Sequence, residues 1–239
     1  MSTFVPVEDA SAWMDQGLAL LLGAMDSLDD TSQDQPTALP GWTRRHVLAH
    51  VASNAEALQR LASWARTGEE NPMYASAQQR DDEIDRGATL PPDELRDWVR
   101  TSAARLGADL GSLPEQAWRA QVVTAQGRTV PATELPWMRA REVAVHAVDL
   151  DAGVTFADLP TAFCAELIGD VAGRRSSVGD GPALHLRAAD SDRTWTVAGT
   201  GDPAAVSGTV DALARWLTGR GTEGIRTDDA PTPTLPRWL

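Results

Sequence analysis

The sequence predicts an α+β protein in which a four-helix bundle is followed by a small α/β domain. Apolar residues recur at helical spacing in four long segments of the first 155 residues. Polar or Pro/Gly-rich stretches separate these segments, as is typical of a bundle. From about residue 160 the pattern changes to short alternating runs flanked by helical ones. We therefore expect two domains, residues 1–155 and residues 156–239.

The helices of the first domain are predicted at residues 7–29, 43–67, 91–110 and 133–151. Thr43 follows the turn-forming PTALPGW and suits the start of the second helix, because its hydroxyl can cap free backbone amides. Proline is tolerated in a first helical turn, which places the third helix start at Pro91–Pro92. Residues 68–92 are too polar for a core element and predict a long loop with a short helix. The string VVTAQGRTVPAT predicts an irregular hairpin.

The second domain begins with a predicted helix over residues 160–174. Apolar and polar residues then alternate in ALHLRAAD and RTWTVAG, as in half-buried strands, and AAVSGTV is a third candidate strand. The segment VDALARWLTGR has helical spacing and is expected to stop at Gly221.

The composition excludes several classes of function. A net charge of −13 disfavours binding to nucleic acid or to an anionic membrane, and no apolar run is long enough to span a bilayer. The N-terminus lacks the pattern of a signal peptide, so we expect a cytoplasmic location. All 21 basic residues are arginine, which excludes lysine Schiff-base chemistry. The single cysteine, Cys164, excludes an internal disulfide, and its apolar helical setting favours packing over catalysis.

Three side chains on two predicted helices form a candidate metal site. Glu142 and His146 are four residues apart and share one helix face, and His50 lies among apolar residues of the second helix. An unpaired glutamate on an inward face would be costly, whereas a metal-bound one is satisfied. Two histidines, one glutamate and an open fourth position are a catalytic zinc arrangement, and Fe(II) accepts the same ligands. We predict a divalent-metal site, with zinc as the expected ion.

The strings GWTRRHVLAHVASNAEAL, WARTGEENPMY and TAQGRTVPATELPWMRAREVAVHAVDL resemble the mycothiol-dependent maleylpyruvate isomerases of the DinB-like superfamily, and the terminal PRWL fits the same pattern. The resemblance covers essentially the whole chain, more loosely over residues 160–200. It implies a DinB-like metal-binding helix bundle with a small α/β C-terminal domain. It also implies His50, Glu142 and His146 as the metal ligands.

The resemblance further implies an activity, the cis–trans isomerisation of maleylpyruvate to fumarylpyruvate in aromatic (gentisate) degradation, with mycothiol as cosubstrate. The cis double bond must become single before it can rotate, and addition of a thiolate achieves this. A zinc-bound thiol is deprotonated, so the open metal position would supply the thiolate. The alternatives are a mycothiol S-transferase acting on other electrophiles, and a non-catalytic metal-binding regulator whose shell Asp149 or His46 would close. The oligomeric state stays open, a monomer included.

Two further residues are candidates for the catalytic machinery. Arg220, at the end of the last predicted helix, is the first candidate to bind the substrate's carboxylates, with capping of that helix as the alternative. Asp149 follows His146 by three residues and is a candidate to accept its second N–H, with helix-end capping or exposure as alternatives.

Other polar and aromatic neighbours of the ligands are expected to be structural. Arg139 and Arg141 flank Glu142, and helical geometry is expected to turn them away from the ligands into solvated salt bridges. Trp42 and Trp137 could wall the site, although large aromatic residues more often belong to the core.

Overall fold

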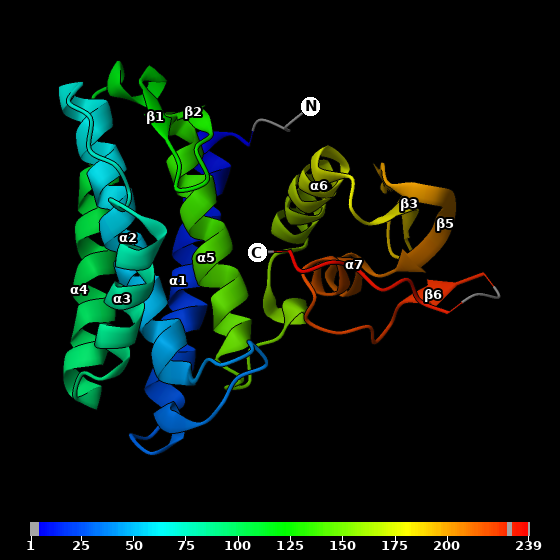
Figure 1. The fold of residues 1–239 in the computed structure, drawn as a ribbon, viewed down its shortest axis with the longest axis horizontal. Coiled ribbons are helices and arrows are strands. Elements are labelled where there is room, and N and C mark those ends of the chain that lie inside the picture. The colour runs from blue at the N-terminus through cyan, green and yellow to red at the C-terminus, as the bar shows by residue number, and fades with distance from the viewer. Residues whose placement is uncertain (1–4, 229–230, 239) are drawn as a thin grey trace. The chain divides into compact units, whose positions relative to one another are not determined.

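The computed structural model describes residues 5–228 and 231–238 (Figure 1). Val5–Val154 form one compact unit, and the described residues from Thr155 onward belong to a second. Leu239, the last residue of the PRWL string, lies outside the described residues. No helix within the described ranges is long and apolar enough to cross a membrane.

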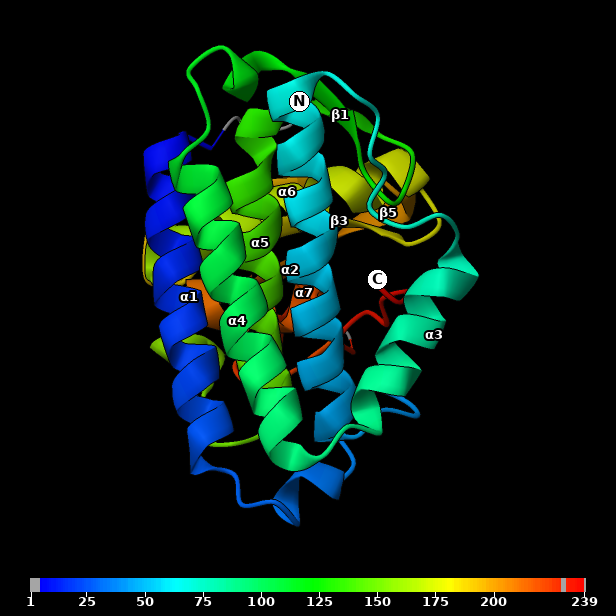
Figure 2. The same cartoon turned by 90° about the vertical axis from the view of Figure 1, so that its left-hand side faces the viewer.

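The first unit is a bundle of four long helices (Figure 2), namely α1 (Val7–Ser27), α2 (Arg44–Thr67), α4 (Pro92–Gly111) and α5 (Leu135–Asp149). Helix α1 packs against α5, and α2 packs against α4 and α5. The shorter α3 (Ala77–Ala88) packs against α2 and is the short helix predicted in the polar stretch. The α+β class with an N-terminal helical bundle is confirmed, and each long helix ends within two residues of its predicted bounds.

The two helices that carry the candidate ligands are tied together at their ends. Thr43 precedes α2 in an extended conformation and is its N-cap, as predicted. The next residue, Arg44, donates from Nε to the carbonyl of Leu150, just beyond α5, over 2.6 Å. The start of α2 is therefore fixed against the end of α5.

The close approach of α1 fixes which face of α5 is turned into the core. A Cβ atom on Gly17 would come within 2.9 Å of Val143 Cγ2 and 3.1 Å of the Ala144 backbone nitrogen. Val143 and Ala144 are buried in this contact. Because Glu142 and His146 lie on another side of the same helix, they are left to face α2.

A short hairpin and a mixed sheet complete the fold. Strands β1 (Gln121–Val123) and β2 (Thr129–Pro131) pair antiparallel in the predicted hairpin. The second unit contains α6 (Thr161–Val178), α7 (Val210–Leu217) and a sheet of order β4-β3-β5-β6, whose strands are β3 (Pro182–Ala188), β4 (Thr194–Val197), β5 (Thr200–Gly208) and β6 (Arg226–Thr227). Strand β3 is parallel to β5 and antiparallel to β4. The two-residue β6 is not among the predicted strands, because it is too short to show an alternating pattern.

Helix α7 ends earlier than the sequence predicts. Its last residue is Leu217, and Gly219 adopts the left-handed conformation with φ of 80°. The backbone N–H of Arg220 then donates to the carbonyl of Arg215 over 2.9 Å, which closes the helix end. Gly219 is therefore the stop in place of Gly221, and Arg220 lies beyond the helix.

Candidate metal centre

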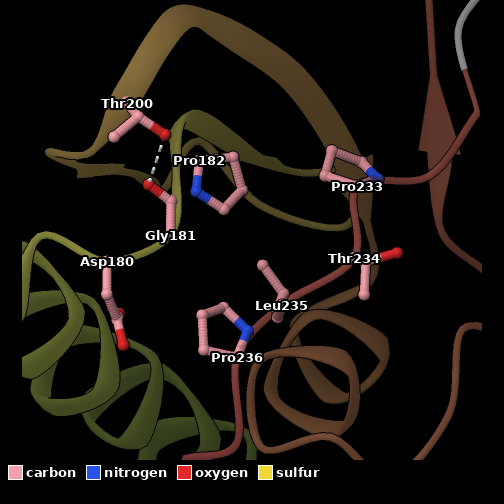
Figure 3. Close-up of a pocket in the computed structure, with 8 residues that line it drawn as sticks. All are labelled: Asp180, Gly181, Pro182, Thr200, Pro233, Thr234, Leu235 and Pro236. Atoms are coloured by element: carbon pink, nitrogen blue, oxygen red, sulfur yellow. Dashed lines mark hydrogen bonds between the residues drawn. The ribbon is translucent and has the colours of Figure 1, made fainter.

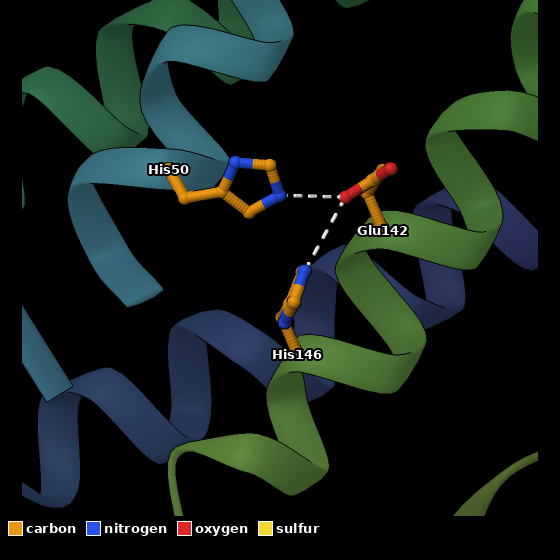
Figure 4. A group of neighbouring side chains, drawn as sticks. All are labelled: His50, Glu142 and His146. Carbon is orange, nitrogen blue, oxygen red and sulfur yellow. Dashed lines mark hydrogen bonds and ion pairs between the residues drawn. The ribbon is translucent and has the colours of Figure 1, made fainter. Parts of the chain in front are cut away.

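His50, Glu142 and His146 converge, and their candidate ligand atoms all lie within 4.8 Å of one another (Figure 4). The Glu142 Oε2 atom is 2.9 Å from His50 Nε2 and 3.3 Å from His146 Nε2. The two imidazole rings are nearly perpendicular, with their centres 4.8 Å apart. The structure thus brings together the three residues that the sequence predicts as ligands.

The three side chains differ in how far they are buried. His50 is 6% exposed and belongs to the buried face of α2. Glu142 and His146 are half-buried, and the Glu142 side chain is the most exposed of the three. Glu142 is therefore the member of the group that is most accessible to solvent.

The electrostatics of the group favour a bound cation. Burial lowers the pKa of His50, which keeps this imidazole neutral. Burial alone would raise the pKa of Glu142, but hydrogen bonds with His146 and His50 hold it well below its usual value. Burial would likewise lower the pKa of His146, but hydrogen bonds with Asp149 and Glu142 raise it to about 9. The carboxylate is therefore ionised, and both histidines direct a ring nitrogen toward it.

This donor set fits a divalent transition metal. Two imidazole nitrogens and one carboxylate oxygen are the protein ligands of a class of catalytic zinc site, and the same set suits Fe(II). Among the histidine, cysteine, aspartate and glutamate side chains of the described residues, one group lies close enough together to hold an ion, and it consists of these three. Protein side chains would thus occupy three positions and leave others open.

Asp149 contacts the far side of one candidate ligand. Its Oδ2 atom is 2.8 Å from Nδ1 of His146, and the residue is only 4% exposed. Histidines that bind metals usually donate their second N–H to a carboxylate or a carbonyl, which fixes the orientation of the ring. Because Asp149 is buried, the alternative of an exposed side chain is wrong. Its carboxylate lies at Nδ1 of His146, the position that such an acceptor would take.

His46 and the tryptophans have different surroundings. The backbone N–H of Thr43 donates to His46 Nδ1 over 3.2 Å, so the His46 ring belongs to the cap of α2. Trp42 stacks on His46 and also lies beside His50, with a ring separation of 5.4 Å. Trp137 is buried and packs edge-on against Trp13. Trp42 therefore borders the candidate ligands, while Trp137 is part of the core.

The expectation of a solvated Arg139 is wrong. Arg139 is 2% exposed, and its Nη1 atom donates to the Val51 carbonyl over 2.8 Å and to Asn54 Oδ1 over 2.9 Å. Burial lowers its pKa to about 10, so the guanidinium remains charged at neutral pH. Arg139 thus joins α5 to α2 inside the bundle. Arg141 is half-buried and lies over the Trp137 ring at 5.9 Å.

Arg220 and Cys164 belong to the second unit. Arg220 Nη1 donates to the Thr218 carbonyl over 2.6 Å, and its guanidinium carbon lies 5.7 Å from the centre of the Trp238 ring. These contacts agree with a role at the end of α7, and the predicted binding of substrate carboxylates by Arg220 stays a prediction. Cys164 is fully buried, which fits packing.

The polar residues 68–92 have no predicted role, but charges in this segment and in the ligand group affect one another's pKa values. Arg80 adds a minor part to the lowering of the His50 pKa by burial, and burial, with a smaller part from the charge of Glu142, raises the pKa of Tyr74. Tyr74 is the single tyrosine of the chain, and it ends the WARTGEENPMY string.

A separate hollow of about 420 Å³ lies in the second unit (Figure 3). Its lining consists of Asp180–Pro182 at the start of β3, Thr200, and Pro233–Pro236. The Thr200 hydroxyl donates to the carbonyl of Gly181 within it, over 3.3 Å. This lining holds a single carboxylate and no histidine or cysteine, so it does not resemble the metal centre.

Comparison with known families and structures covers both units. The family model for the mycothiol maleylpyruvate isomerase N-terminal domain matches residues 14–151, and that for the MDMPI C-terminal domain matches residues 158–236. A crystal structure of the mycothiol-dependent maleylpyruvate isomerase is 40% identical, with a TM-score of 0.94 and 100% of both chains covered. The structure of a histidine-to-alanine variant of that isomerase gives the same values. No curated protein sequence matches the chain.

Proposed function

The chain belongs to the mycothiol-dependent maleylpyruvate isomerase family, and we propose on this basis that it converts maleylpyruvate to fumarylpyruvate with mycothiol as cosubstrate. The observation that carries this proposal is the 40% identity to a solved isomerase over the full length of both chains. The protein is accordingly a cis–trans isomerase whose partners are small molecules. The same proposal places its reaction in aromatic degradation and the protein in the cytoplasm.

We further propose that His50, Glu142 and His146 hold a divalent ion, and that this ion is zinc. The convergence of two imidazoles on one ionised carboxylate supports the assignment. Zinc would supply a thiolate at neutral pH, because coordination lowers the pKa of a bound thiol. The Glu142 carboxylate contributes negative charge, and His50 contributes a neutral nitrogen.

The neighbouring residues would hold this ligand set in position. Asp149 accepts a hydrogen bond from His146 and so keeps the other ring nitrogen directed toward Glu142. Trp42 covers one side of the His50 ring. Because Nδ1 of His146 is already bonded to Asp149, the imidazole ring is held in one orientation before a metal ion binds.

The regulatory alternative loses its main support in this geometry. It requires a fourth protein ligand, for which Asp149 and His46 are the candidates. Asp149 lies against the far nitrogen of His146, and His46 Nδ1 is engaged in the cap of α2. Within the described residues, the group suited to a metal has three members, which supports the reading with an open position.

An absorbance assay of maleylpyruvate isomerisation tests the function. Protein of known metal content is assayed with and without mycothiol, and turnover is expected only when both metal and thiol are present. The His50→Ala variant should lose the bound metal and the activity while its helical content is unchanged. The matched control is His185→Ala, which removes an exposed histidine from β3 and should retain both.

Full activity of the metal-free protein would overturn the metal assignment. Turnover of other electrophiles with mycothiol, without isomerisation of maleylpyruvate, would establish the S-transferase in its place.

A further inference from the structure

Arg139 is a charged side chain in the interior of the helix bundle. It is 2% exposed, and its pKa of about 10 leaves it charged at neutral pH. Its Nη1 atom donates to the Val51 carbonyl over 2.8 Å and to Asn54 Oδ1 over 2.9 Å. Its Nη2 atom is also buried and has no hydrogen-bond partner among the described residues. Both acceptors are neutral groups, so the contact between α5 and α2 is not an ion pair.

A buried charge of this kind is seldom explained by the stability of a fold. A guanidinium loses its hydration when it is buried, and hydrogen bonds to neutral groups return only part of that loss. Even buried ion pairs can often be replaced by well-packed apolar side chains without loss of stability. The presence of an arginine at this position therefore calls for another reason, and its location supplies one.

The contacts of Arg139 lie one helical turn from the candidate ligands. Figure 4 shows His50 and Glu142 pointing toward each other from α2 and α5. Arg139 precedes Glu142 by three positions, so the two side chains are neighbours on α5. On α2, Val51 directly follows His50, and Asn54 is four positions after it on the same face. The Arg139–Asn54 contact is therefore the next cross-link along the two helices.

A second arginine cross-links the same helices on the other side of the ligands. Arg44, six positions before His50 on α2, donates from Nε to the Leu150 carbonyl over 2.6 Å. Along α2 the order is Arg44, His50 and then the partners of Arg139, and along α5 the order is reversed. The His50–Glu142 contact thus lies between two arginine cross-links of an antiparallel helix pair.

We propose that Arg139 is a positioning residue of the metal centre, whose hydrogen bonds to Val51 and Asn54 hold α2 and α5 at the spacing that lets His50 and Glu142 bind one ion. This inference rests on the metal assignment of the proposed function. Zinc takes nitrogen and oxygen ligands at about 2.0–2.2 Å, so a small shift between the two helices alters the bonds from both of them.

The charge of Arg139 also acts on the ligand carboxylate. Burial lowers the pKa of Arg139, and the charge of Glu142 opposes this effect. Opposite charges three positions apart on a helix stabilise each other. An arginine at this position therefore supports the ionised form of Glu142 while it cross-links the helices, which an apolar side chain would not do.

The Arg139→Lys variant tests the cross-link while it keeps the charge. The ammonium of a lysine ends one bond short of the Nη1 position and cannot reproduce the bonds to Val51 and Asn54. We expect zinc affinity to fall on the order of 10–100-fold, as is typical when a residue that supports metal ligands is changed, with unchanged helical content. Competition with a zinc chelator measures the affinity. The absorption spectrum of the cobalt(II)-loaded variant should also change, because it reports the coordination geometry.

Arg175→Lys is the matched control. Arg175 is likewise buried, and its Nη2 atom donates to the carbonyls of Leu217 and Pro236 over 2.8 and 3.0 Å, all within the second unit. This change should lower the free energy of unfolding and leave zinc affinity and the cobalt spectrum as in the wild type. Loss of a buried arginine contact would then not be sufficient to weaken metal binding.

Asn54→Ala tests the same cross-link from the side of α2. It removes one of the two acceptors of Arg139 and should lower zinc affinity about tenfold. Combined with Arg139→Lys, it should add little further loss, because both changes break one cross-link.

Wild-type zinc affinity in a folded Arg139→Lys variant, or an equal loss in Arg175→Lys, would overturn the positioning role. If Arg139→Lys misfolds, Asn54→Ala decides, and wild-type affinity in that variant would overturn the role. Failure of the wild type to bind a divalent ion would overturn the ligand assignment and the role of Arg139 with it. Absence of isomerisation by the metal-loaded wild type would overturn only the proposed reaction, because the affinity measurements do not depend on turnover.

Discussion

The Oδ2 atom of Asp149 lies 2.8 Å from Nδ1 of His146, on the opposite side of the imidazole from Glu142. Both residues belong to α5, and Asp149 is its last residue. The ring of His146 is thus held between two carboxylates. One of them belongs to the candidate ligand set, and the other is buried behind it.

Replacing Asp149 with asparagine should weaken metal binding without abolishing it. The amide is a poorer acceptor for the His146 N–H, and such changes typically cost 10–100-fold in metal affinity. Competition with a zinc chelator measures the effect. Asp151→Asn is the matched control, because Asp151 is exposed and pairs only loosely with Arg44, at 3.9 Å. Equal affinities for the two variants would show that Asp149 does not support the site.

Metal uptake should depend on pH through His146. Its pKa of about 9 in the metal-free protein means that the ring is protonated at neutral pH and must lose this proton to bind an ion. His50 is already neutral and Glu142 already ionised, so one proton is released per metal bound. We expect affinity to rise about tenfold per pH unit between about pH 6.5 and 8.5. Calorimetry in buffers of different ionisation enthalpy counts the proton, and an affinity independent of pH would refute the mechanism.

Cys164 should be inert. Burial, with a smaller contribution from the charge of Asp211, raises the pKa of its thiol to about 12. A thiol that is fully buried and protonated cannot act as a nucleophile. The native protein should not react with a chromogenic disulfide reagent near neutral pH, and Cys164→Ala should keep turnover within about twofold. A large loss of turnover with the fold preserved would show that the thiolate is not borrowed from a small molecule.

Gly17 should tolerate no side chain. Because its Cβ would lie 2.9 Å from Val143 Cγ2, Gly17→Ala must displace α5 and is expected to lower the free energy of unfolding by about 1–3 kcal/mol. Gly23→Ala in the same helix is the control, since nothing lies within 4 Å of its Cβ position. That change should stabilise the protein by about 0.5–1 kcal/mol. Denaturant unfolding compares the two, and equal effects would argue against a close α1–α5 contact.

Much of the fold could be read from periodicity. The spacing of apolar residues locates all four long helices, because a helix with one buried face repeats every 3.6 residues. It also places Glu142 and His146 on one face, since residues four apart are neighbours on a helix surface. The end of α7 was harder to place, because both Gly219 and Gly221 could stop a helix. The hydrogen bond from the Arg220 N–H to the Arg215 carbonyl shows that the helix ends at Gly219.

The sequence by itself determined the helices, the candidate ligand types and, through its resemblance, the family. Tertiary structure alone decided that Arg139 is buried rather than solvated, because its partners Val51 and Asn54 lie on another helix more than eighty positions away. Periodicity records which face of an element is apolar, but it does not record which distant polar groups will meet a given side chain once the helices pack.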